Sequence, residues 1–234
     1  KLRNEFTSVL TGKGLTWGGS LIRPEATGYG TVYFAQSMLQ TKGDGFEGKR
    51  VVISGSGNVA QYACEKAIQL GAKVLTVSDS NGFALFPDSG MTEAQLAALI
   101  ELKEVRRERV KTYAQEQGLQ YFEGQKPWGV KCDIALPCAT QNELDGKDAA
   151  TLLVNGVQCV AEGANMPSTL EAVEAFLKAK ILYAPGKASN AGGVATSGLE
   201  MSQNHIRLSW PREKVDGRLF DIMANIHENC VANG

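Results

Sequence analysis

A glycine-rich turn between an apolar strand and a helix constrains this chain more than any other feature of its sequence. Residues 50–54 form an apolar run that predicts a buried strand, and residues 58–70 carry apolar side chains at helical spacing. Residues 55–60 read GSGNVA, which fits the pattern G-x-G-x-x-A, and a second predicted strand over 73–79 ends in an acid. The glycines allow a tight turn and close approach of a pyrophosphate. In this βαβ context a dinucleotide site is favoured over a plain strand-to-helix turn.

The alternation of strands and helices continues to the end of the chain. Further strands are predicted over 120–123, 132–136, 158–162 and 180–184. Further helices are predicted over 27–40, 92–117, 148–153, 168–179, 194–208 and 213–230, with capping boxes at Thr92/Gln95 and Ser168/Glu171 and a turn-rich stretch over 81–90. We therefore expect an α/β, Rossmann-like fold with a mostly parallel, doubly wound sheet and helices on both faces. Residues 1–234 are expected to form one NAD(P)-binding domain, with 1–48 as an entry segment and helix.

Composition and charge exclude several other classes. Lys and Arg number 24 against 25 Asp and Glu, with no long basic run, so a nucleic-acid partner is not expected. No apolar run approaches the roughly 18 residues of a membrane helix, and residues 1–5 lack the apolar region of a signal peptide. Five cysteines without a CxxC pair and two histidines disfavour a disulfide framework or a metal site. We expect a cytoplasmic protein that binds neither membranes nor metal ions.

The residues after the second strand bear on the choice of cofactor. Asp79 is placed to accept hydrogen bonds from an adenosine ribose, which by itself indicates NAD. Ser80 and a group of cations could instead receive a ribose 2′-phosphate, and these cations are Lys103, Arg106, Arg107 and Arg109. Interleaved glutamates also fit an ordinary solvated helix face. NADP is therefore preferred, and NAD stays possible.

Five ordered motifs together resemble one enzyme family. They lie at 23–30, 55–60, 136–143, 162–167 and 190–197. The chain resembles glutamate dehydrogenase over essentially its whole length, and most closely the hexameric bacterial NADP-dependent type. The resemblance implies reversible reductive amination of 2-oxoglutarate with ammonia to L-glutamate, a role in amino-acid metabolism and nitrogen assimilation, and a homo-oligomeric, hexameric enzyme.

The resemblance also implies roles for individual residues. The cofactor-binding set is Thr27, Gly55, Ser56, Gly57, Asn58, Val59, Asp79, Ser80, Lys103, Ala139, Thr140, Asn165 and Asn190. Within it, Thr27 and Asn190 would hold the nicotinamide carboxamide, and Lys103 would reach the 2′-phosphate, with Arg106 a weaker candidate. Val194 and Ser197 would contact the substrate.

The substrate pair has a physical rationale of its own. Val194 and Ser197 lie three residues apart on one predicted helix and so share a face. A hydroxyl at Ser197 could bond a second carboxylate, as glutamate requires, although a small residue here would also ease helix packing. Two alternatives stay open, namely a leucine- or phenylalanine-type amino-acid dehydrogenase domain and a non-catalytic nucleotide-sensing module.

No catalytic residue is expected within this chain. In the family that the chain resembles, a lysine polarises the carbonyl and a carboxylate transfers a proton, and both would belong to an N-terminal substrate domain absent from the chain. Lys13 and Lys187 lie in glycine-rich loops without the family's lysine motif. His205, His227 and Cys138 lack the pattern of a nucleophile with its base. We expect this chain to bind cofactor without turnover.

Overall fold

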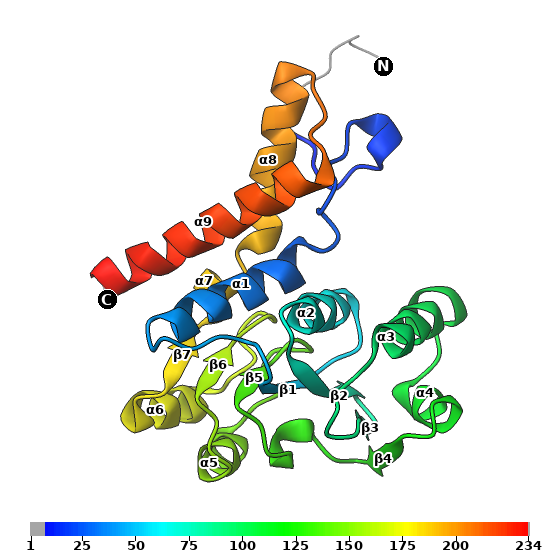
Figure 1. Ribbon diagram of the computed structural model, residues 1–234, viewed down its shortest axis with the longest axis vertical. Coiled ribbons are helices and arrows are strands. Elements are labelled where there is room, and N and C mark those ends of the chain that lie inside the picture. The colour runs from blue at the N-terminus through cyan, green and yellow to red at the C-terminus, as the bar shows by residue number, and fades with distance from the viewer. Residues whose placement is uncertain (1–7, 234) are drawn as a thin grey trace.

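A seven-stranded sheet forms the centre of the computed structural model, which describes residues 8–233 (Figure 1). Its strand order is β4-β3-β2-β1-β5-β6-β7. The strands are β1 (Arg50–Ile53), β2 (Lys73–Asp79), β3 (Gly82–Leu85), β4 (Gln120–Glu123), β5 (Ile134–Leu136), β6 (Cys159–Ala161) and β7 (Leu182–Ala184). β1 pairs in parallel with β2 and β5, and β6 and β7 extend the parallel set, whereas β3 is antiparallel to both of its neighbours. The predicted mostly parallel sheet is confirmed.

Helices cover both faces of this sheet. In Figure 1, α1 and α2 lie on one side of it and α5 and α6 on the other, while α8 and α9 lie beyond α1. The helices are α1 (Ala26–Gln40), α2 (Asn58–Gln69), α3 (Glu93–Ile100), α4 (Val110–Glu116), α5 (Gly146–Val154), α6 (Leu170–Ala179), α7 (Gly186–Ser189), α8 (Gly192–Ile206) and α9 (Arg212–Asn233). Shorter turns are η1 (Leu15–Trp17), the π-helical η2 (Glu101–Arg106) and η3 (Pro127–Gly129). No described helix is both long and apolar enough to cross a membrane.

The central strand β1 is apolar at three successive positions because each face of the sheet has its own core. In β1, Val51 and Ile53 belong to the core that contains α1 and α2. Val52 between them belongs to the second core, which contains residues of α5 and α6. Successive side chains of a strand point to opposite faces, so a doubly covered sheet needs an unbroken apolar run. This explains why short runs such as residues 50–54 could be identified as buried strands.

Helix α1 packs with its backbone almost in contact with two other helices. A Cβ atom added at Gly28 would lie 2.6 Å from the Val59 carbonyl oxygen and from the Ala63 nitrogen of α2. A Cβ added at Gly30 would lie 2.7 Å from the Cα of Gly192 at the start of α8. Glycine at these positions therefore allows α1 to bring the first turns of α2 and α8 close together.

Two segments differ from the sequence-based prediction. The stretch 81–90, expected to be turn-rich, contains strand β3, which forms a hairpin with β2 and pairs Phe83 with Ser78. The predicted single helix over 92–117 is divided into α3, η2 and α4. Arg107 ends η2 in the left-handed conformation, with φ of 56°. The sequence contains no glycine or proline to signal this break, which accompanies the hydrogen bond from the amide of Val110 to Asp79.

Of the two predicted capping boxes, one is present in the structure and one is not. Thr92 and Gln95 cap α3 in the predicted reciprocal arrangement. The box predicted for Ser168 and Glu171 is wrong, because the N-cap is Thr169, which makes no side-chain cap. Ser168 instead forms a β-bridge with Leu144. A tertiary contact thus moves the start of α6 one residue beyond the position that the local pattern indicates.

One face of α8 is polar although it is buried. Gln203 donates from Nε2 to the Ser20 hydroxyl at 2.8 Å, and Asn204 donates from Nδ2 to the Gly18 carbonyl at 2.7 Å. Both partners belong to the segment 12–23 that precedes α1. The polar face of α8 therefore holds this irregular segment against the helix, and it supplies hydrogen bonds that a buried loop backbone requires.

The strongest contact along this face is an ion pair. The fully buried Glu200 carboxylate accepts hydrogen bonds from the Gly12 amide at 2.9 Å and from the Lys13 ammonium. Burial alone would raise the pKa of the Glu200 carboxyl, but the hydrogen bonds from Lys13 and Gly12 hold it below its ordinary value. The carboxylate is therefore ionised and fastens the start of the described chain to α8.

Replacing Glu200 by alanine should lower the free energy of unfolding by about 3 kcal/mol, because it leaves a largely buried ammonium group without its partner. Urea denaturation of the chain measures this value. Replacing Lys111 by methionine is the control, since the Lys111–Glu123 pair is exposed and should contribute less than about 1 kcal/mol. Equal losses in the two variants would contradict the assigned role of Glu200.

Candidate functional site

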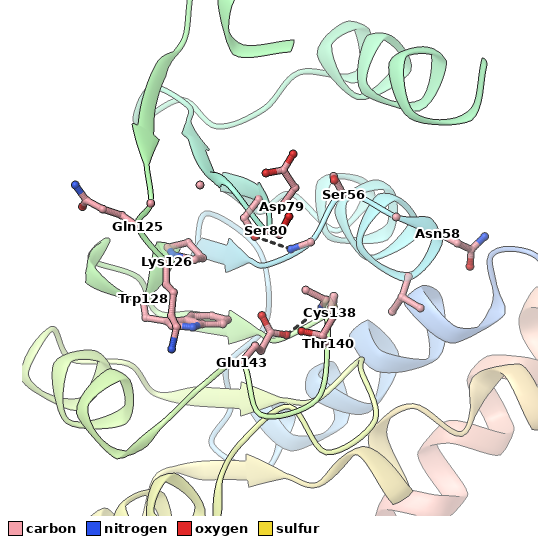
Figure 2. Close-up of a pocket in the computed structure, with 18 residues that line it drawn as sticks. Ser56, Asn58, Asp79, Ser80, Gln125, Lys126, Trp128, Cys138, Thr140 and Glu143 are labelled. Atoms are coloured by element: carbon pink, nitrogen blue, oxygen red, sulfur yellow. Dashed lines mark hydrogen bonds between the residues drawn. The ribbon is translucent and has the colours of Figure 1, made fainter. Parts of the chain in front are cut away.

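The candidate site lies at the carboxyl edge of the sheet beside β1, which has β2 on one side and β5 on the other, so that the strand order reverses direction at β1. In open α/β sheets this switch point is where ligands bind. A cavity of about 670 Å³ occupies it, and we call it the glycine-loop cleft (Figure 2). Its lining comes from residues 55–59, 78–80, 124–128 and 138–140, with Gly82 and Glu143. Its volume is in the range of small-molecule sites.

The glycine loop after β1 is held firmly in place. The Gly55 amide donates to the Ser78 hydroxyl at 2.8 Å, and the Ser78 amide donates back to the Gly55 carbonyl at 3.0 Å. Gly55 has φ of 88°, and a Cβ there would lie 3.0 Å from the Cys138 carbonyl oxygen. Only glycine combines this left-handed backbone with so close an approach to the loop after β5. The first glycine of the motif thus has a structural reason.

The start of α2 faces the same cleft with free donors. Gly57 is the N-cap, and no side chain of the described residues caps the helix. The first amides of a helix have no intrahelical acceptor, and with the helix dipole they attract anions. A Cβ at Gly57 would meet no atom within 4 Å, so the space beside the helix start is open. This geometry suits a phosphate group.

At the far end of the cleft, Asp79 and Ser80 have different partners. The Asp79 carboxylate accepts hydrogen bonds from the amides of Asn81 and Val110, each at 2.9 Å. It therefore holds the β2–β3 turn and the start of α4, and it can still accept further hydrogen bonds. The Ser80 hydroxyl accepts a hydrogen bond from Nη1 of Arg109 at 3.1 Å. A guanidinium group thus stands beside the position predicted for a 2′-phosphate.

Lys103 and Arg106 lie outside the lining of the cleft. The Lys103 ammonium donates to the Glu108 carbonyl at 3.0 Å, and Arg106 forms ion pairs with Glu108 and Glu116. The break after η2 turns the chain here, so that Arg109 is the member of the predicted cation group in contact with Ser80. The role of Lys103 at a 2′-phosphate stays a prediction.

A second cavity of about 830 Å³ adjoins the first, and we call it the α8 cleft. The two clefts share Val59 and the loop residues 138–140. Its lining includes the remaining predicted site residues, namely Thr27, Asn165, Asn190, Val194 and Ser197. The structure thus brings together every predicted cofactor and substrate residue except Lys103 around two adjoining clefts.

Hydrogen bonds orient the polar side chains of the α8 cleft. Asn190 donates from Nδ2 to the Asn165 side-chain oxygen at 2.9 Å. Arg23 donates from Nε to the Ser197 hydroxyl at 3.0 Å, and Ser197 in turn donates to the Gly193 carbonyl at 3.1 Å. The cationic head of Arg23 and the hydroxyl of Ser197 therefore form one polar pair on the wall of this cavity, at the second turn of α8.

Neither cleft shows the features of nucleophilic or metal catalysis. Burial raises the pKa of the Cys138 thiol well above its ordinary value, so the thiol stays protonated. Within residues 8–233 no group of three or more His, Cys, Asp or Glu residues is placed to hold a metal ion. The polar groups of the clefts can bind and orient a ligand, and the cleft dimensions and free amides fit a dinucleotide.

Some lining residues were not singled out by the sequence analysis. Arg23 and Glu143 lie inside motifs that carried the resemblance, but no spacing rule assigned them a partner. The segment 124–128 lines the glycine-loop cleft opposite Asp79 and Ser80 (Figure 2). It follows β4, whose position depends on the β3 hairpin that the sequence analysis missed. No local signal in the sequence places this segment at the cleft.

Comparisons with known proteins agree with this geometry. The family model described as glutamate/leucine/phenylalanine/valine dehydrogenase matches residues 18–234. The NADP-specific glutamate dehydrogenase of Haemophilus influenzae is 62% identical over the whole chain, and the NAD(P)-specific glutamate dehydrogenase of Xylanibacter ruminicola is 61% identical. The chain spans about half the length of these relatives, 52% in each case.

A solved structure shows the same fold. The chain is similar to Plasmodium falciparum glutamate dehydrogenase 2, with a TM-score of 0.95 and 51% sequence identity. The similarity covers 98% of this chain and 50% of that protein. The arrangement of strands and helices around the two clefts is therefore shared with a known dehydrogenase.

Replacing Gly57 by alanine should leave folding nearly unchanged but weaken NADPH binding at least tenfold. The added methyl group projects into open space, where a pyrophosphate would need to approach the backbone. The unfolding free energy should change by less than about 1 kcal/mol. Calorimetric titration with NADPH and urea denaturation measure the two effects. Gly198→Ala, at another open position, is the control for binding, and normal NADPH affinity of Gly57→Ala would count against the site.

Proposed function

The chain belongs to the glutamate/leucine/phenylalanine/valine dehydrogenase family, and we propose that it is the NADP(H)-binding part of a glutamate dehydrogenase. The whole protein would interconvert 2-oxoglutarate, ammonia and L-glutamate by reversible reductive amination. The main support for this proposal is that the two clefts lie next to each other and share the loop 138–140 as a common wall. A dinucleotide that spans both would have its phosphates at the start of α2 and its nicotinamide beside α8.

The residues present fit such a cofactor. The free amides at the start of α2 would hold the pyrophosphate, with Ser56, Asn58 and Val59 along its path. Thr27 and Asn190 line the α8 cleft, where the nicotinamide carboxamide would be held. When bound, the nicotinamide supplies or accepts the hydride of the reaction. Asp79 and Ser80 would border the adenosine ribose.

The contact between Arg109 and Ser80 supports NADP over NAD. A guanidinium group binds a phosphate through two parallel, charge-assisted hydrogen bonds. Asp79 by itself would repel a 2′-phosphate, but both of its oxygens already accept backbone hydrogen bonds. We propose NADP as the preferred cofactor, with NAD as a second possibility.

The pairing of Arg23 with Ser197 favours glutamate over an apolar amino acid. A substrate with a second carboxylate could be bound by both groups, whereas a leucine or phenylalanine side chain would leave the half-buried Arg23 guanidinium without an anionic partner. Val194 beside them would contact the methylene groups. The alternative of a leucine- or phenylalanine-type enzyme is therefore less compatible with this wall of the cavity.

The groups that perform the chemistry are proposed to lie outside residues 1–234. The two clefts offer binding and orienting groups, and the resemblance implies that the lysine and the carboxylate belong to a separate substrate domain. The chain alone would then bind cofactor without turnover, as a non-catalytic nucleotide-sensing module also would. Turnover by the complete protein would separate this proposal from that alternative. A homohexameric assembly and a cytoplasmic location are proposed on the same basis.

Replacing Arg109 by glutamine should weaken NADPH binding about tenfold or more and leave NADH binding nearly unchanged, because a charge-assisted contact to the 2′-phosphate is lost. Calorimetric titration of the chain with both cofactors gives the ratio. Lys103→Gln, tested in parallel, shows whether that lysine contributes to the same selectivity. Arg107→Gln is the exposed control in the same turn. Equal weakening of NADPH and NADH in Arg109→Gln would contradict the assignment.

Replacing Ser197 by alanine, in a catalytically complete protein that carries this chain, should reduce kcat/KM for glutamate at least tenfold relative to norvaline. The reason is that the second carboxylate loses a hydrogen-bond donor while norvaline loses nothing. Arg23→Gln should shift the preference in the same direction. Steady-state kinetics with both amino acids measure the ratio, and an unchanged ratio in both variants would exclude this pair as the specificity device.

A further inference from the structure

The loop that follows β5 separates the two clefts and contributes to both. Cys138, Ala139 and Thr140 line the glycine-loop cleft and the α8 cleft alike. The carbonyl of Cys138 also lies against Gly55 of the glycine loop, where a Cβ would come within 3.0 Å of it. A ligand that spans both clefts must pass along this loop. The position of the loop backbone therefore decides whether the clefts can hold one extended molecule.

Only a few hydrogen bonds fix the loop at its centre. The Cys138 amide donates to the hydroxyl of Ser54, a buried residue directly after β1, at 2.9 Å. The Ala139 amide donates to Oε1 of Glu143 at 3.0 Å (Figure 2). At the base of the loop, the amides of Gly163 and Ala164 donate to the Pro137 carbonyl, each at 2.9 Å. Further along the loop, the Asn142 amide donates to the Met166 carbonyl at 2.9 Å, so in the stretch that lines both clefts the Glu143 side chain is the acceptor for Ala139.

The Glu143 carboxylate is surrounded by donors from its own loop and from β1. Burial raises the pKa of its carboxyl, and hydrogen bonds from the Ser54 hydroxyl and from the Ala139 and Thr140 amides lower it. The effect of burial is the larger, so the pKa of Glu143 lies above its ordinary value. Lys126 also faces it, but the Lys126 ammonium is bound to Asp148 at 2.7 Å. The Cys138 thiol is neutral, because burial holds its pKa high. Glu143 thus has loop donors as its partners and no ion-pair partner among the described residues.

We propose that Glu143 is a positioning residue, whose carboxylate holds the backbone of residues 138–140 in the shape that the dinucleotide requires. It acts through the loop and is not itself a contact to the reacting atoms. This inference rests on the proposed function, because the dinucleotide is taken to be the ligand of the two clefts. It assigns a role to a residue for which sequence patterns gave none.

The role predicts a specific effect on binding. Replacing Glu143 by alanine should raise the dissociation constant of NADPH about tenfold, since the loop loses a charge-assisted acceptor. Glu143→Gln retains one acceptor oxygen for the Ala139 amide and should have a smaller effect. Glu174→Ala, an exposed glutamate on α6, is the control and should bind NADPH as the unmodified chain does. Titration calorimetry measures all four proteins.

Two further readouts separate positioning from general destabilisation and from direct ligand contact. Without cofactor, the amides of Ala139 and Thr140 should exchange hydrogen faster in Glu143→Ala, while those of β1 and β6 stay protected. In addition, protonation of Glu143 removes its negative charge and leaves a neutral acceptor like that of glutamine, so NADPH binding should weaken on mild acidification more in the unmodified chain than in Glu143→Gln. Comparing the two proteins cancels the titration of the ligand's own phosphate. Lys126 stays charged throughout, because contacts with Asp148 and Asp145 raise its pKa despite burial.

The outcomes are distinct. If the unmodified chain does not bind NADPH, the proposed function fails. If it binds and Glu143→Ala binds equally well, or if amide exchange in the loop is unchanged while affinity falls, the positioning role is overturned. Should Glu143→Ala fail to fold, the different acid response of Glu143→Gln and the unmodified chain decides, and parallel pH profiles would refute the inference.

Discussion

The close approach of α1 to both α2 and α8 is the contact on which the site depends. At Gly28 and Gly30 there is no room for a methyl group between the helix backbones. As a result, Thr27 on α1, the free amides at the start of α2 and Ser197 on α8 all reach the same edge of the sheet. A larger side chain at either glycine would move two helix starts apart and divide the two clefts.

The direction of the parallel strands supplies the second constraint. β1, β2, β5 and β6 all end at this edge, so the loops that follow them meet there. Hydrogen bonds between these loops then fix their shape, as Ser54 after β1 does for Cys138 after β5. Two carboxylates beside the glycine-loop cleft act in the same way, because Asp79 and Glu143 both accept hydrogen bonds from backbone amides. Acidic residues thus fix the shape of the loops at this edge of the sheet.

The polar face of α8 connects the α8 cleft to the segment before α1. Glu200, Gln203 and Asn204 hold residues 12–20, and one turn away Ser197 holds Arg23. A displacement of that segment would therefore change the position of Arg23 relative to Ser197.

The sequence by itself determined the fold class, the strand positions of the parallel sheet and most of the predicted residues that line the two clefts. It could do so because doubly covered strands are continuously apolar and because the glycine loop, its strand and its helix are adjacent in the chain. Tertiary structure alone decided the β3 hairpin, the break after η2, the start of α6 at Thr169 and the partners of Arg109, Arg23 and Glu143. Apart from the hydrogen bond of Glu143 within its own loop and the pairing of β3 with the adjacent β2, each of these depends on contacts between segments far apart in the sequence, and local propensity carries no information about such contacts.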